Sequence, residues 1–210
     1  MGYSLAAMEN LFPTPLWHYR IDEPGLDALL MKEVAARRAA EPGLPNPNRL
    51  GWQSRHDLFD RTEAGHMKLL HLIRAVIGDT LRSLQQNLDH TAIRVALNGW
   101  VNINPPGGYN APHQHADSLL SGVYYVSVPP GASNSGGAIE FLAPHPVRQV
   151  GGLMQAPMFA ERFRVKPVAG DLLLFPGQLS HWVHPNDSGE ERVTIAFNAR
   201  VTPESRAQPR

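Results

Sequence analysis

Short β-rich runs separated by turns dominate the sequence after residue 91. The runs are Ile93–Ile103, Leu119–Val128, Ala138–Phe141, Phe163–Val165, Asp171–Phe175 and Arg192–Val201. Most of the 19 prolines and 18 glycines lie after residue 100, where they separate these runs. Because no helical segments alternate with the runs, the pattern predicts an antiparallel sandwich or barrel rather than a parallel, doubly wound sheet.

The first ninety residues have a different pattern. Apolar residues recur at helical spacing from Leu26 to Val34 and again from Met67 to Leu88, which predicts two helices. We expect the second helix to run from Thr62 to about Leu88, with an interruption near Gly78. Leu11–Ile21 is predicted to form an extended entry strand or arm, and residues 41–56 an ordered loop rich in proline, asparagine and glycine.

These patterns predict a single domain over residues 1–210. Residues 1–90 would form a helical support region, residues 91–202 the β-rich core and residues 203–210 a polar tail. A chain of this length can bury a substantial core without disulfides.

Composition excludes several classes of function. The 19 basic and 19 acidic residues cancel, which argues against broad electrostatic binding to nucleic acid or anionic membrane. No cysteine is present, so disulfides, iron–sulfur clusters, thiolate zinc sites and cysteine nucleophiles are excluded. No apolar run approaches the roughly 18 residues of a membrane span, and the N-terminus lacks a signal-peptide pattern. We therefore expect a cytoplasmic protein.

Two histidine-containing segments form a candidate metal site. His113, His115 and Asp117 follow a Gly-Gly turn, and strand residues two apart face the same side, so these side chains can converge inside a barrel. Imidazole and carboxylate ligands suit iron, manganese, zinc, nickel or copper. A buried strand at Leu172–Phe175 then leads to His181, which we prefer as the distal ligand, whereas His184, next to a proline, is expected at the pocket mouth.

A third segment brings a charge into the predicted core. Arg192 opens an otherwise apolar strand, and Thr194 shares its face. A buried arginine is costly unless paired, and its planar guanidinium suits a carboxylate in bidentate contact. The Thr194 hydroxyl would add a further donor to the same carboxylate.

Together these residues resemble the iron(II)- and 2-oxoglutarate-dependent oxygenases, and most closely a bacterial and phage branch of them. The matching elements, in order, are Leu11-Phe12-Pro13-Thr14-Pro15-Leu16, Trp100, Asn102, Gly107-Gly108-Tyr109, His113, His115, Ser121-Gly122-Val123-Tyr124-Tyr125, Phe175-Pro176, His181, Val183, Arg192 and Phe197-Asn198. The resemblance covers most of the chain, and the ordered set is far more specific than any one motif.

The resemblance implies a double-stranded β-helix (jelly-roll) core with N-terminal helices. It implies iron(II) as the metal and O2 and 2-oxoglutarate as cosubstrates, with a C–H bond hydroxylated and succinate and CO2 released. Arg192 and Thr194 would hold the far carboxylate of 2-oxoglutarate, and Tyr125 would also reach it. Asn102, Tyr109 and His184 are further pocket candidates.

The motif departs from the family at one position, because His115 stands where a carboxylate is expected. Three ligand sets remain open: His113, His115 and His181; His115, Asp117 and His181 in a shifted register; or His113 and His181 with water. We favour the first. An imidazole in place of a carboxylate raises the net charge of the metal site by one, which affects redox tuning and metal preference.

Two other functions remain open. The spacing of Gly107 and His113-x-His115, and of Gly170, Pro176 and His181, partly matches the two cupin motifs, which would indicate a three-histidine dioxygenase or isomerase without 2-oxoglutarate. The second of these functions is that of a non-enzymatic jelly-roll binding module. The sequence does not identify the small-molecule or peptide substrate. Residues 142–165, which include Arg148 and Arg162, are a candidate lid, and the N-terminal arm and second helix offer surfaces for a homodimer.

Overall fold

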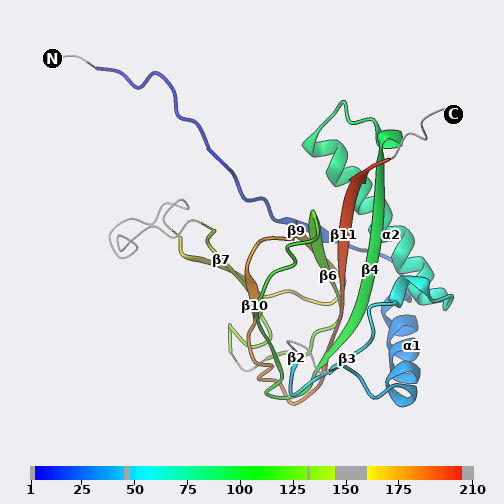
Figure 1. Cartoon of the computed structure of the whole chain (residues 1–210). Coiled ribbons are helices and arrows are strands. Elements are labelled where there is room, and N and C mark those ends of the chain that lie inside the picture. Colours follow the sequence, from blue (N-terminus) through cyan, green and yellow to red (C-terminus); the bar gives the residue numbers. More distant parts are fainter. Residues whose placement is uncertain (1–2, 45–47, 132, 145–159, 205–210) are drawn as a thin grey trace, which may run out of the picture.

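Two antiparallel sheets form the centre of this computed structural model, which describes residues 3–44, 48–131, 133–144 and 160–204 (Figure 1). The strands are β1 (Trp17–Arg20), β2 (Asn48–Arg49), β3 (Trp52–Gln53), β4 (Ile93–Asn104), β5 (Tyr109–His113), β6 (Leu120–Ser127), β7 (Ile139–Leu142), β8 (Arg162–Val165), β9 (Asp171–Pro176), β10 (His181–Val183) and β11 (Arg192–Pro203). The six-stranded sheet has the order β1-β9-β6-β11-β4-β3, and the five-stranded sheet has the order β2-β5-β10-β7-β8.

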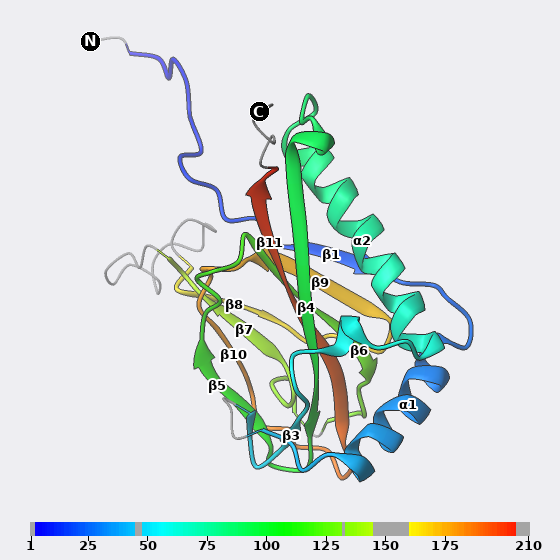
Figure 2. The ribbon, with the colours of Figure 1, turned by 45° about the vertical axis from the view of Figure 1, so that its right-hand side comes forward.

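Two helices, α1 (Leu26–Ala40) and α2 (Ala64–Leu84), cover one face of the six-stranded sheet (Figure 2). Short 3₁₀ turns, η1 (Leu58–Asp60) and η2 (His90–Ala92), precede α2 and β4. Helix α2 buries a stripe that includes Leu69, Ile73 and Ile77, as its apolar spacing predicts. It runs through Gly78 without a break and ends at Leu84, so the predicted interruption is wrong. Neither described helix is long and apolar enough to cross a membrane.

Strand β11 separates two environments by simple alternation. One set of side chains joins the apolar core under the helices: Val193, Ile195, Phe197 and Ala199. The alternate set lines a cavity between the two sheets: Arg192, Thr194, Ala196 and Asn198. Successive residues of a strand point to opposite faces, so this one strand contributes both to the core and to the candidate site.

A second, smaller core lies between the sheets. Val123, Tyr125, Leu173 and Phe175 from the six-stranded sheet pack with a set from the other sheet and its loops. That set is Ile139, Phe141, Leu179 and Val183. Apolar side chains therefore form both walls of the cavity, and polar side chains occupy only some of the positions that face it.

The N-terminal region also contributes strands. β2 and β3 lie inside the predicted loop 41–56 and add an edge strand to each sheet. Only Trp17–Arg20 of the predicted arm forms a strand, and residues 3–14 are exposed and lead away from the sheets (Figure 1). Most of the candidate lid, residues 145–159, lies outside the described residues. Arg162 belongs to β8, which pairs with β7.

We predict that Gly122→Ala destabilises the protein, although alanine normally suits a strand better than glycine. A Cβ at Gly122 would lie 2.2 Å from Cζ of Phe197, which is fully buried. Overpacking of this kind costs about 1–3 kcal/mol, measured as a lower free energy of unfolding in urea. Gly189→Ala is the matched control because its Cβ would meet no atom within 4 Å. Equal unfolding midpoints for the two variants would contradict the packing argument.

Candidate metal centre and adjoining cavity

Three histidines from two segments of the chain converge at one end of the cavity. His113 ends β5, His181 begins β10, and the two residues are paired in the five-stranded sheet. His115 lies two residues beyond β5, and its backbone N–H donates to the Gly177 carbonyl at 2.7 Å. Imidazole nitrogens of the three residues all lie within 4.8 Å of one another. This spacing suits a single metal ion bound by all three rings.

Backbone carbonyls fix the orientation of two of these rings. Nδ1 of His113 lies 2.7 Å from the Ala111 carbonyl oxygen, and Nδ1 of His181 lies 2.8 Å from the Leu179 carbonyl oxygen. A carbonyl only accepts, so each Nδ1 carries the hydrogen and each Nε2 keeps its lone pair. Such contacts on the non-ligating nitrogen are typical of histidines that bind metals.

The environment also keeps the histidines neutral. Burial, together with the neighbouring imidazoles, lowers the pKa of His181 to about 3 and the pKa of His115 to about 4. Burial also lowers the pKa of His113. A metal binds the neutral imidazole, so no proton has to be displaced from these rings near pH 7.

Asp117 does not join the histidines. Strand β5 ends at His113, and the chain turns between His115 and Ser118, whose N–H donates to the His115 carbonyl at 3.0 Å. The alternation that would bring Asp117 inward is therefore broken, and its side chain is 90% exposed, with an oxygen 3.8 Å from Arg200. No carboxylate from the described ranges belongs to the three-histidine group. The structure thus gives no support to the shifted ligand register.

The cavity extends from the histidines to Arg192 and has a volume of about 260 Å³. Thr194 of β11 is paired with Asn102 of β4 on one side and with Tyr125 of β6 on the other. These three side chains share the face that lines the cavity, next to Arg192. Three predicted cosubstrate residues, Arg192, Thr194 and Tyr125, are therefore brought together with the candidate Asn102.

Several polar atoms at this end of the cavity have no hydrogen-bond partner in the part of the chain that the structure describes. They are Arg192 Nε, Tyr125 Oη and Asn102 Oδ1, and all three residues are at least 95% buried. The guanidinium carbon of Arg192 lies 5.1 Å from the centre of the Tyr125 ring. Burial raises the pKa of Tyr125 to about 12, against the opposing effect of Arg192, so the hydroxyl stays protonated and can donate. Buried polar groups without partners are costly, so these atoms are suited to hydrogen-bond a polar group in the cavity.

Two predicted pocket residues lie elsewhere. Tyr109 is paired with Arg49 of β2 and does not line the cavity. His184 follows β10, in which His181 and Val183 face the cavity, so Trp182 and His184 face away from it. The expectation that His184 lies at the mouth is therefore wrong, because strand alternation puts it on the outer face of the sheet.

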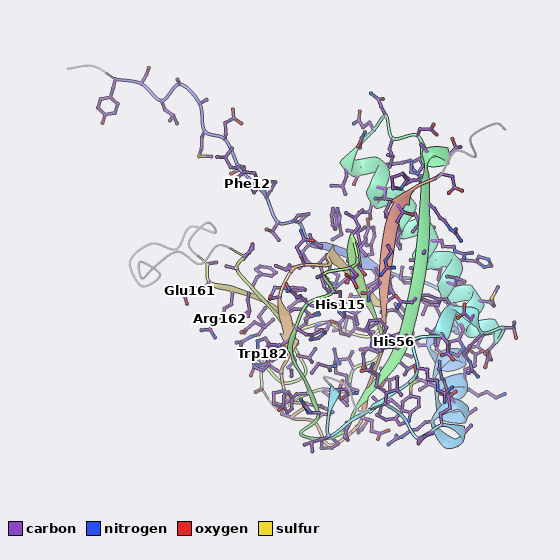
Figure 3. All side chains as sticks on the ribbon, viewed as in Figure 1. Phe12, His56, His115, Glu161, Arg162 and Trp182 are labelled. Atoms are coloured by element: carbon purple, nitrogen blue, oxygen red, sulfur yellow. The ribbon has the colours of Figure 1, made fainter. Side chains whose placement is uncertain are left out.

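On that outer face, His184 contacts a buried carboxylate that the sequence analysis missed. Glu140 of β7 accepts hydrogen bonds from Trp182 Nε1 at 3.1 Å, His184 Nε2 at 3.1 Å and Arg164 Nη2 at 2.7 Å. Burial alone would raise the pKa of Glu140, but these hydrogen bonds outweigh it and lower the pKa to about 2. Figure 3 shows Arg162 and Trp182 on this side of the molecule. The cluster ties β7, β8 and β10 together behind the metal centre.

His56 is another residue that the sequence analysis missed. It follows β3, and its ring stacks on Trp100 with centroids 4.4 Å apart, while the Trp100 ring lies 5.7 Å from that of His115. Both His56 and Trp100 line the cavity, and Figure 3 labels His56 and His115. The surrounding loop has no periodic pattern, so nothing in the sequence indicated that His56 would approach the histidine group.

Comparisons with known proteins agree with this geometry. Residues 98–198 match the model of the family described as "Putative 2OG-Fe(II) oxygenase". The matched segment contains His113, His115, His181, Arg192 and Thr194. A search of curated proteins finds no significant match.

Solved structures show the same fold at low sequence identity. A prolyl-4-hydroxylase of Pseudomonas putida is 18% identical, with 88% of this chain and 91% of that chain covered and a TM-score of 0.64. A Trichoplax adhaerens prolyl hydroxylase, in complex with a hypoxia-inducible factor peptide, is 15% identical, with coverages of 88% and 83% and a TM-score of 0.59. HygX of Streptomyces hygroscopicus, with nickel, 2-oxoglutarate and hygromycin B bound, is 14% identical, with coverages of 89% and 83% and a TM-score of 0.59. The predicted double-stranded β-helix core is confirmed.

We predict that metal binding depends on the histidines and not on Asp117. His181→Ala should weaken binding of cobalt(II), used as a spectroscopic probe, by more than the roughly 10–100-fold cost of losing an outer-shell partner. Asp117→Asn should bind cobalt(II) as the wild type does, because its carboxylate is exposed and points elsewhere. Circular dichroism would verify that both variants fold. Weaker binding by Asp117→Asn would instead restore the shifted register.

We further predict that Glu140→Gln destabilises the protein at pH 7 by roughly 2–3 kcal/mol. Because the pKa of Glu140 is lowered to about 2 in the folded state, its contribution is present above the unfolded pKa near 4.5 and is lost as the pH falls toward 2. The variant should therefore lose this part of the pH dependence in urea unfolding. Glu161→Gln, at an exposed neighbouring position, is the matched control. An unchanged slope in Glu140→Gln would contradict the assignment.

Proposed function

Because residues 98–198 belong to the 2OG-Fe(II) oxygenase family, we propose that this oxygenase hydroxylates a C–H bond of a small molecule or peptide. The proposal rests on the residues that line one cavity. Three neutral imidazoles converge at one end, and a buried guanidinium lies at the other, with no acidic partner among the described residues. The two ends match a metal and the distal carboxylate of an anionic cosubstrate.

In this proposal, His113 and His181 hold iron(II) through their Nε2 atoms, and His115 supplies the third imidazole. Arg192 and Thr194 bind the distal carboxylate of 2-oxoglutarate, and the protonated Tyr125 hydroxyl donates to it. When bound, iron(II) and 2-oxoglutarate supply the activation of O2, with succinate and CO2 as products. The protein orients these partners and excludes water through the apolar residues between the sheets.

The residues present fit such a cosubstrate. Arg192 Nε and Tyr125 Oη are buried donors without partners, so a carboxylate would satisfy both. Three neutral ligands leave the full charge of a divalent metal in the site, one unit more than a site with one carboxylate. The dianionic cosubstrate offsets much of the combined charge of the metal and Arg192.

The three-histidine cupin remains the second candidate, since its ligand set matches the histidines equally well. The two candidates differ at the opposite end of the cavity, because a cupin that does not use 2-oxoglutarate does not need a buried cation there. Arg192 is 98% buried there, and burying a charge without function is costly. This observation favours the oxygenase.

Two further parts of the proposal concern the setting. We place the protein in the cytoplasm, whose reducing conditions favour ferrous iron. The exposed arm at residues 3–14 is compatible with a homodimer.

The test is an anaerobic titration of iron(II) with and without 2-oxoglutarate. We expect a weak visible absorption band, from the keto acid chelated to iron, only when both are present. Arg192→Met should still bind iron(II) but need roughly tenfold or more 2-oxoglutarate to develop the band, because a charge-assisted bidentate contact is lost. Arg192→Lys should fall between the two. Iron binding with no band in the wild type would favour the cupin, and no metal binding would favour a binding module.

A further inference from the structure

The partner of Arg192 is an amide where a carboxylate would be the usual choice. Its Nη1 donates to Oδ1 of Asn104 at 3.1 Å, and Asn104 is fully buried. Arg192 forms no ion pair with any acidic residue in the described part of the chain. Tyr125 is the neighbouring side chain that affects the pKa of its guanidinium. The guanidinium is thus held in place while its positive charge remains uncompensated.

A network of buried asparagines fixes which way the Asn104 amide points. Asn104 Nδ2 donates to Oδ1 of Asn48 at 2.9 Å and to Oδ1 of Asn110 at 3.2 Å. Asn48 in turn donates to the Trp52 carbonyl at 2.9 Å. Because both hydrogens of the Asn104 amide have acceptors, its oxygen must face Arg192. The network therefore orients the guanidinium from behind, using only neutral groups.

Charge decides what this arrangement can bind. A carboxylate at position 104 would form a charge-assisted pair with Arg192 and cancel its charge before any ligand arrives. The neutral amide gives the same direction of hydrogen bonding, and the guanidinium still attracts an anion strongly in this buried, low-dielectric region.

We infer that Asn104 is a positioning residue that keeps Arg192 oriented but electrically uncompensated, and so makes the cavity select ligands with a negatively charged far end. This inference rests on the proposed function, since it concerns the cosubstrate end of the same cavity. The expected consequence is discrimination between two ligands of nearly equal size that differ only in distal charge.

The experiment compares 2-oxoglutarate with 2,5-dioxohexanoate, in which the distal carboxylate is replaced by an uncharged methyl ketone of nearly the same size. Binding to the full chain loaded with iron(II) is measured anaerobically by calorimetry, so no turnover is needed. We expect the wild type to prefer 2-oxoglutarate by roughly tenfold or more, the value of one charge-assisted contact. Asn104→Asp should reduce this preference to about twofold or less, with iron(II) affinity unchanged.

Two further variants separate charge from structure. Asn104→Thr keeps a neutral acceptor, so it should weaken both ligands by a similar factor and retain the preference. Asn98→Asp makes the same chemical change at an exposed position of the same strand, and it should retain the wild-type preference. Loss of the preference in either variant would show that the charge at position 104 is not what matters.

Failure of the proposed function and failure of the inference about Asn104 give different results. If the iron-loaded wild type binds no 2-oxoglutarate, the proposed function itself fails. If it binds both ligands equally, or if a folded Asn104→Asp keeps the preference, the inference about Asn104 is overturned and the oxygenase assignment stands. If Asn104→Asp does not fold, the wild-type preference and the Asn104→Thr result still support or overturn it.

Discussion

The pairing of β4 with β11 determines where almost every functional group lies. The two strands pair from Arg192 opposite Asn104 to Pro203 opposite Ile93 without a register shift. Alternate residues of β11 therefore face the helices or the cavity, and a slip of one residue would exchange the two sets. Such a slip would turn Arg192 toward the apolar core under the helices, so the core and the site enforce the same register.

That register has an energetic consequence at the cavity. The side chains facing the helices contribute hydrophobic burial, whereas those facing the cavity include a buried cation and polar atoms without partners. The hydrophobic burial by the first group offsets the free-energy cost of burying the second group. This is expected when a functional site is less stable than the scaffold around it. A ligand that satisfies Arg192 and Tyr125 binds the folded state alone, so it should also stabilise the fold.

Local pattern was enough to predict much of this arrangement. The alternation in Arg192–Val201 indicated a strand with one mixed face, and His113-x-His115 indicated convergent imidazoles. The first inference holds because it depends only on the alternation of consecutive strand residues. The imidazoles of His113 and His115 also converge, although His115 lies beyond the end of β5 and its backbone is held by Gly177. The same rule applies to His184: its parity relative to His181 places it on the outer face of the sheet, and the adjacent proline does not change that.

Other features depend on contacts that no local pattern records. Whether Asp117 turns inward depends on where β5 ends, and that is set by the turn between His115 and Ser118. Glu140 is a buried carboxylate only because three strands bring Arg164, Trp182 and His184 around it.

Position 104 shows most clearly what a local sequence pattern leaves undetermined. The sequence indicates that Arg192 enters the core and suits a carboxylate, but the charge it offers to a ligand depends on what already pairs with it. That partner is Asn104, 88 positions away, whose amide direction is in turn fixed by Asn48 and Asn110. An arginine motif therefore predicts a capacity for binding anions, whereas the neutrality of the residues behind it determines whether that capacity is free.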